Sequence, residues 1–168
     1  MEAKKEVQIA LLSSELLYDI GSMCYVEGDL AERDTGKDMH QVIDGIVGEN
    51  KNRILRMLNL SVTKLCELLF PFCKSETEKL ELRDDALIEE YSYGFTLQVP
   101  NDFSESSVNR LTALMHEYMV SFVMADWMSI TKPGAEEKWL MKCATTEQEM
   151  RSTINRRMKR VRRSLNPW

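Results

Sequence analysis

The segment with the clearest structural signal is FSESSVNRLTALMHEYMVSFVMADWMSI, residues 103–130. Its apolar side chains recur at helical spacing and cover much of the helix circumference. A helix that is apolar on most sides has to be covered by other elements, so we expect it to be the central and most buried helix. Asp102, with Glu105 three residues later, resembles a capping box and is predicted to begin this helix.

The elements on either side of this helix follow from shorter patterns. Before it, residues 91–99 alternate apolar and polar side chains, which predicts a strand. Residues 80–83 are the predicted antiparallel partner of that strand. After it, the Lys-Pro-Gly sequence at 132–134 breaks the helix, and its proline favours the start of a last helix, predicted over residues 134–160.

The first half of the chain has weaker patterns. Residues 7–12 begin with a strand-like alternation, and the apolar residues after them favour a helix over residues 13–26. Residues 27–38 are polar with two glycines and are predicted to form a loop. A short apolar turn is expected at 42–47. Residues 50–69 repeat apolar side chains at spacings of three and four, which predicts an amphipathic helix.

These patterns predict a mostly α-helical fold of the α+β class, a bundle of about four helices with a short antiparallel β-hairpin or sheet. A chain of 168 residues suffices for one hydrophobic core, so we expect residues 1–168 to form a single domain. No apolar run is long enough to predict a membrane-spanning helix. The charged start, residues 1–6, argues against a signal peptide.

Charge is distributed unevenly along the chain, whose formal net charge is −5. Residues 1–150 hold 15 of the 22 basic residues and all 27 acidic residues, a balance of −12. No acid follows Glu149, and residues 151–168 carry the other seven basic residues. This asymmetry indicates an acidic body with a basic C-terminal arm that contacts an anionic partner.

The basic arm, residues 151–168, is the strongest candidate for a functional site. Three interpretations stay open: a solvated helix end stabilised by the helix dipole, docking on an acidic protein surface or a neighbouring copy of this chain, and nucleic-acid binding. The tryptophan at position 168 is suited to anchoring at an interface. The candidate interface residues are Arg156, Arg157, Lys159, Arg160, Arg162, Arg163 and Trp168.

No pattern typical of catalysis or of cofactor binding occurs in the sequence. The four cysteines lack the spacing of a zinc site and are expected to be reduced, mostly buried thiols. His116 is a candidate general base, but a lone helical histidine is more often structural. Asp126 is interpreted as an acid that is either bound to a partner within the fold or located at an interface. We therefore predict a protein that is not an enzyme and that uses no cofactor, metal or small-molecule substrate.

The second half of the chain has a recognisable order of elements. The strand over residues 91–99 precedes a helix with His116-Glu117-Tyr118 and Ala125-Asp126-Trp127, and a turn at 130–133 precedes a helix with an arginine-rich end. This order resembles small structural proteins encoded among the head and tail genes of tailed phages and prophages of gut Bacteroides-type bacteria. The resemblance covers residues 90–163, and the closest functional class is the neck, the head–tail connector or adaptor proteins.

The resemblance implies a structural virion protein that forms a homo-oligomeric ring between portal and tail proteins, with DNA passing through it non-specifically. It implies a location in the virion, and in the cytoplasm of the bacterial host during assembly. An acidic body suits such a passage because like charge lets DNA slide rather than bind. The alternatives are a tail terminator or tail-completion protein, a nucleic-acid-binding regulator that uses the basic arm, and a small enzyme that acts through His116.

Overall fold

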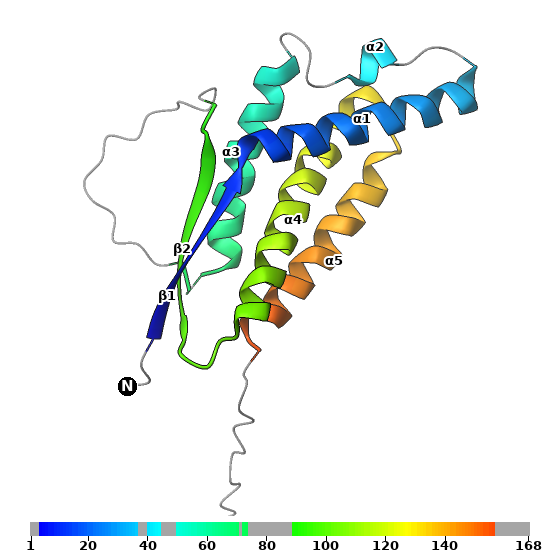
Figure 1. The fold of residues 1–168 in the computed structure, drawn as a ribbon. Helices are drawn as coiled ribbons and strands as arrows, with labels where there is room; N and C mark the ends of the chain where they lie inside the picture. Colours follow the sequence, from blue (N-terminus) through cyan, green and yellow to red (C-terminus); the bar gives the residue numbers. More distant parts are fainter. Residues whose placement is uncertain (1–3, 37–39, 45–49, 71, 74–88, 157–168) are drawn as a thin grey trace, which may run out of the picture.

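Figure 1 shows the computed structural model of the chain, which describes residues 4–36, 40–44, 50–70, 72–73 and 89–156. Four long helices and a one-turn helix accompany a two-stranded antiparallel sheet, so the predicted fold class is confirmed. In chain order the elements are β1 (Lys4–Leu12), α1 (Ser13–Thr35), α2 (His40–Ile43), α3 (Asn50–Leu68), β2 (Ser92–Pro100), α4 (Glu105–Thr131) and α5 (Glu136–Ile154). Within the described part of the chain, no helix is long and apolar enough to cross a membrane.

The sheet pairs β1 with β2, from Lys4 opposite Pro100 to Leu12 opposite Ser92. Alternate side chains of both strands are buried on the face toward the helices, as the alternating sequence predicts. The predicted partner of β2, residues 80–83, lies outside the described residues. The strand that the structure places beside β2 is β1, so the sheet joins segments far apart in sequence and is not a hairpin. The buried strand residues are Ile9, Leu11, Tyr93, Phe95, Leu97 and Val99.

Helix α4 lies at the centre of the helices, as its apolar circumference predicts. It packs against α5, α3, α1 and β1, and Figure 1 shows α1 crossing one end of it. Thirteen of its 27 residues are buried. An amphipathic surface helix buries only one face, so α4 is covered on more sides than such a helix is. An ion pair of 3.0 Å between Arg110 and Glu149 joins its N-terminal part to the C-terminal part of α5. The core therefore surrounds α4 on several sides.

Helix α1 is longer than predicted, because it continues to Thr35. The predicted loop over residues 27–38 is therefore wrong for its first nine positions. Glu27 is 3 % exposed and forms an ion pair with Lys138 of α5, and Ala31 is also buried. These tertiary contacts stabilise a helical segment whose polar sequence gives only a weak local preference for helix.

Two predicted ends of helices are also wrong. Asp102 does not cap α4; the N-cap is Ser104, whose side-chain oxygen accepts a hydrogen bond from the Ser107 N–H at 3.2 Å. Helix α5 ends at Ile154, before the predicted end at residue 160. By contrast, α3 confirms the helix predicted over residues 50–69 to within a residue.

Candidate functional site

The basic arm, residues 151–168, begins in the last turn of α5, which ends at Ile154. Arg156 is exposed, and its backbone N–H donates to the Thr153 carbonyl at 3.1 Å. Figure 1 shows this end of α5 beside the start of α4. Arg156 is thus the one predicted interface residue that the structure places. The remaining ones, Arg157, Lys159, Arg160, Arg162, Arg163 and Trp168, lie outside the described residues.

Strand β1 presents an edge of the sheet. The Ser13 N–H donates to the Tyr91 carbonyl at 3.1 Å, in register with the strands, so the odd-numbered residues of β1 exchange hydrogen bonds with β2. The backbone groups of Glu6, Gln8 and Ala10 therefore point away from β2. No described residue forms a hydrogen bond with these backbone groups. Such an edge can accept a further strand.

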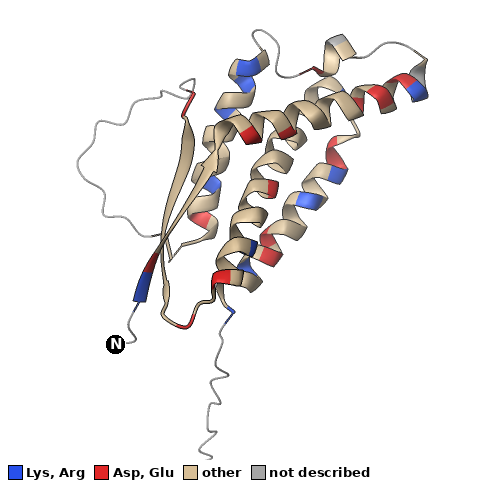
Figure 2. Cartoon of the chain, in the orientation of Figure 1, with Lys and Arg blue, Asp and Glu red and all other residues tan. Residues whose placement is uncertain are grey.

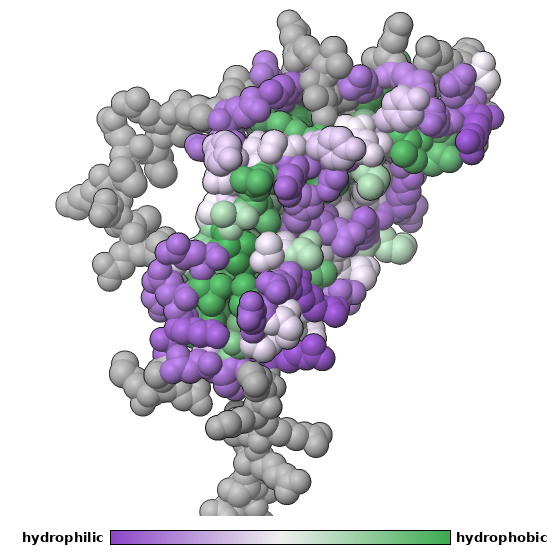
Figure 3. Space-filling model, viewed as in Figure 1, coloured by the Kyte–Doolittle hydropathy of each residue, from purple (hydrophilic) through white to green (hydrophobic). Residues whose placement is uncertain are grey.

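A groove with a volume of about 550 Å³ lies beside this edge. Its walls come from the C-terminal part of β1, the first turns of α1 and the N-terminal half of α4. The β1 wall includes Ala10 and Leu11, and the α4 wall includes the small side chains Thr112 and Ala113. Figure 3 shows hydrophobic surface along the seam between the sheet and the helices. Small side chains opposite an open edge allow a peptide backbone to approach closely.

The α1 wall of the groove is acidic. Glu15 and Asp19, one helical turn apart, both line it, and Figure 2 shows acidic residues in the first turns of α1. Across the groove, His116 Nε2 lies 2.8 Å from Asp19 Oδ2, which ties α4 to α1. The Asp19 side chain is still 47 % exposed, so it retains contact with solvent in the groove. The groove therefore suits a ligand that is basic and partly apolar.

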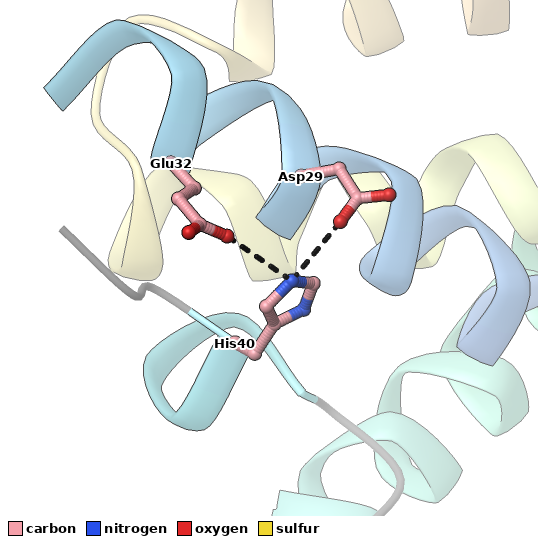
Figure 4. Close-up of side chains that lie close together, drawn as sticks. All are labelled: Asp29, Glu32 and His40. Carbon is pink, nitrogen blue, oxygen red and sulfur yellow. Dashed lines mark hydrogen bonds and ion pairs between the residues drawn. The ribbon is translucent and has the colours of Figure 1, made fainter. Parts of the chain in front are cut away.

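A second polar cluster joins the C-terminal part of α1 to α2. Figure 4 shows the His40 ring pointing from α2 toward Asp29 and Glu32 of α1. His40 Nε2 lies 3.1 Å from Asp29 Oδ1 and 3.9 Å from Glu32 Oε2. One potential ligand atom from each residue lies within 4.8 Å of the other two. An adjoining pocket of about 220 Å³ is lined by His40, Tyr25 and Asp44, among others.

Glycine at position 28 allows His40 to lie close to α1. A Cβ atom on Gly28 would lie 2.6 Å from Nδ1 of His40, well inside van der Waals contact. The ring also packs against Tyr25, with 4.8 Å between the ring centroids. These two contacts hold Nδ1 toward the helix backbone and leave Nε2 toward the carboxylates.

The other polar residues that the sequence singled out are bound within the fold. Asp126 accepts two hydrogen bonds from Arg53, each of 2.9 Å, so its interpretation as a partner-bound acid is confirmed. None of the four cysteines, all of which lie among the described residues, forms a disulfide; Cys24 is buried and the other three are partly buried. Burial raises the pKa of the Cys143 thiol to about 11, which keeps this thiol protonated near neutral pH.

Sequence reasoning missed both the groove and the histidine–carboxylate cluster. The groove depends on the pairing of β1 with β2 and on the position of α4, which no local pattern reveals. The cluster had a sequence signal, since Asp29 and Glu32 share a face once residues 27–35 are helical. Because residues 27–38 were predicted to form a loop, there was no reason to place Asp29 and Glu32 on one helix face.

Comparisons with known proteins identify no relative. No protein-family model, no curated protein and no solved structure matches the chain.

Proposed function

We propose that this chain is a structural protein of the head–tail connector class, a neck adaptor that assembles into a homo-oligomeric ring between the portal and the tail of a tailed phage. The observation that carries the proposal is the acidic groove beside the open edge of β1. It offers a strand edge with which no described residue pairs, small side chains on α4 and two carboxylates in one place. A structural subunit of a closed ring needs such an acceptor for part of its neighbour.

The basic arm has the chemistry that this acceptor requires. Beyond the end of α5, residues 155–168 combine six basic residues with apolar side chains such as Met158, Val161 and Trp168. An extended segment of this composition places main-chain hydrogen bonds on β1 and positive charge opposite Glu15 and Asp19. Because donor and acceptor are different surfaces of one chain, the contact is heterologous and repeats from copy to copy until a ring closes.

The net charge of the body agrees with a structural protein that does not bind DNA tightly. The acidic body, with its balance of −12, disfavours tight DNA binding and suits non-specific passage of DNA through a ring. The proposed partners are the portal and tail proteins, in the virion and, during assembly, in the cytoplasm of the bacterial host. A tail terminator or tail-completion protein, the alternative within this class, would use the same groove and arm.

The proposal is tested first by light scattering on a sizing column, at low and at high salt. We expect a discrete oligomer at low salt, and we expect high salt to shift it toward monomer because the groove–arm contact is ionic. Deletion of residues 157–168 should give a monomer at both salts. A full-length chain that stays monomeric even when mixed with the portal protein would contradict a neck function.

Two point variants separate strand addition from simple charge attraction. Ala10→Pro removes one outward N–H from β1 and leaves the hydrogen bonds to β2 intact, so it should abolish the oligomer. Ala10→Thr keeps the N–H and is the matched control, which should still assemble. Glu15→Lys should weaken assembly at low salt, whereas Glu137→Lys, the same charge change on an exposed residue outside the groove, should not.

A DNA-binding assay decides between the neck adaptor and the nucleic-acid regulator. A short duplex titrated into the protein at physiological salt should show weak binding with no preference for sequence. A tight, sequence-dependent complex whose affinity falls steeply with salt would favour the regulator instead.

A further inference from the structure

We propose that Asp29, Glu32 and His40 form a binding site for one divalent transition-metal ion of the zinc class, which links α1 to α2. This site is separate from the groove and does not depend on the proposed assembly. Its three side chains come from two elements, and Figure 4 shows them converging on one point. The donors are one imidazole nitrogen and two carboxylate oxygens, a set that divalent zinc, iron and manganese accept.

The distances fit a metal that bridges these atoms. Zinc–ligand bonds of about 2.0–2.1 Å place neighbouring ligand atoms about 3.3 Å apart in a tetrahedron. His40 Nε2 lies 3.1 Å from Asp29 Oδ1 and 3.9 Å from Glu32 Oε2, and all three potential ligand atoms lie within 4.8 Å of one another. A small rotation of the Glu32 side chain therefore completes three corners of the tetrahedron.

The backbone prearranges this geometry. Asp29 and Glu32 are three residues apart on α1, so their carboxylates share one face of the helix. The ring of His40 is set by Gly28, where a Cβ would lie 2.6 Å from Nδ1, and by packing against Tyr25. With Nδ1 held toward the helix backbone, Nε2 is the nitrogen that the site offers to a ligand.

The electrostatics also favour a cation. The site lies in the last turns of α1, where Gly36, with φ of 66°, caps the helix and the helix dipole places partial negative charge. The side chains of Asp29 and Glu32 are 44 % and 53 % exposed, and that of His40 is 30 % exposed. A metal can therefore enter from solvent, and water is expected to fill the remaining coordination position.

The test is titration of Zn²⁺ into the tag-free, reduced, full-length protein by calorimetry. We expect one equivalent to bind, and we expect His40→Gln to weaken the affinity at least about tenfold. Asp29→Asn and Glu32→Gln should each weaken it in the same direction. His116→Gln is the matched control, since it removes the other histidine of the chain and its carboxylate contact, and it should leave the Zn²⁺ affinity unchanged.

Gly28→Ala tests the positioning of His40 without removing a ligand. The added Cβ displaces the ring while all three proposed ligand side chains remain, so the Zn²⁺ affinity should fall. The rise in melting temperature that Zn²⁺ gives the unchanged protein should shrink in Gly28→Ala, whereas a merely structural ion pair would give no Zn²⁺-dependent rise in either protein.

Two spectroscopic results decide which atoms bind. The chain has two histidines, so its imidazole NMR spectrum contains two sets of ring signals. Zn²⁺ should shift the signals of His40 and leave those of His116 in place. With Co²⁺ as the probe, weak visible bands without a thiolate charge-transfer band are expected. Unshifted His40 signals, or an intense thiolate band from the cysteines, would overturn the proposal.

Discussion

At the scale of single residues, the thiol of Cys143 gives a direct test of the packing around α4 and α5. Burial is the main cause that raises its pKa from the ordinary value of 9.0 to about 11, and Glu147 adds to the shift. Less thiolate is present near pH 8 than in the unfolded chain, so iodoacetamide should alkylate Cys143 far more slowly in the native protein than in urea. Mass spectrometry of peptides gives both rates, and equal rates would contradict this packing.

The same shift fixes the direction of a pH effect on stability. The folded-state pKa lies above the unfolded value, so the protonated thiol contributes stability that is intact below pH 9.0 and is lost as the pH rises through about 11. Urea unfolding at pH 8 and above pH 10 should therefore show a lower free energy of unfolding at the higher pH. In Cys143→Ser this alkaline loss should be smaller.

Some side-chain contacts could be predicted from the sequence and others could not. The sequence interpretation of Asp126 was confirmed because a lone acid on an apolar helix has few stable surroundings other than a cationic partner. The contact between Glu27 and Lys138 could not be predicted in the same way. It depends on α1 crossing close to the first turn of α5 (Figure 1), which the spacing of neither segment indicates.

At the scale of elements, the short helix α2 is attached to α4 by one hydrogen bond in a buried setting. Trp127 Nε1 donates to the Ile43 carbonyl at 2.7 Å, and both residues are buried. Trp127→Phe leaves this carbonyl without its donor and should lower the free energy of unfolding by about 1–3 kcal/mol, beyond the loss of packing. Urea denaturation followed by circular dichroism measures the change.

Trp139→Phe is the control for this comparison. Trp139 is also buried, but its Nε1 has no hydrogen-bond partner among the described residues. Its replacement costs packing and weakens the contacts of Lys138 and Lys142 with the ring, whose centroid lies 5.5 and 5.6 Å from their Nζ atoms, but it breaks no described hydrogen bond. Trp139→Phe should therefore lower the free energy of unfolding less than Trp127→Phe does. If both variants lose the same stability, the hydrogen bond to Ile43 contributes nothing measurable.

Elements with a sustained period were predicted well, and those that depend on distant contacts were not. Apolar residues recur at helical spacing over several turns of α3 and α4, and they alternate with polar residues along β2. The type of each of these elements was therefore clear from the sequence. The second half of α1 is polar and carries Gly28, and its helical state depends on burial of Glu27 and Ala31. The pairing of β1 with β2 was not predicted, because local sequence does not specify which strand pairs with which.

At the scale of the whole molecule, the arrangement predicts a gradient of local stability centred on α4. Its backbone is enclosed by α1, α3, α5 and β1, so its amides should exchange with solvent only when the protein unfolds globally. Hydrogen exchange read by mass spectrometry should show peptides within residues 111–128 as the slowest. Peptides covering α2 should exchange much faster, and an inverted order would contradict α4 as the centre of the core.

The pairing of β1 with β2 also has a consequence for how the chain folds during synthesis. The sheet brings together Leu12 and Ser92, and Lys4 and Pro100, so no local turn can nucleate it. On the ribosome, β1 stays unpaired and its apolar side chains stay exposed until β2 has left the exit tunnel. Closing so long a loop carries a large entropic cost before any contact compensates for it, which places sheet formation late. The interval in which β1 is unpaired is also when it is most exposed to chaperones and to neighbouring nascent copies.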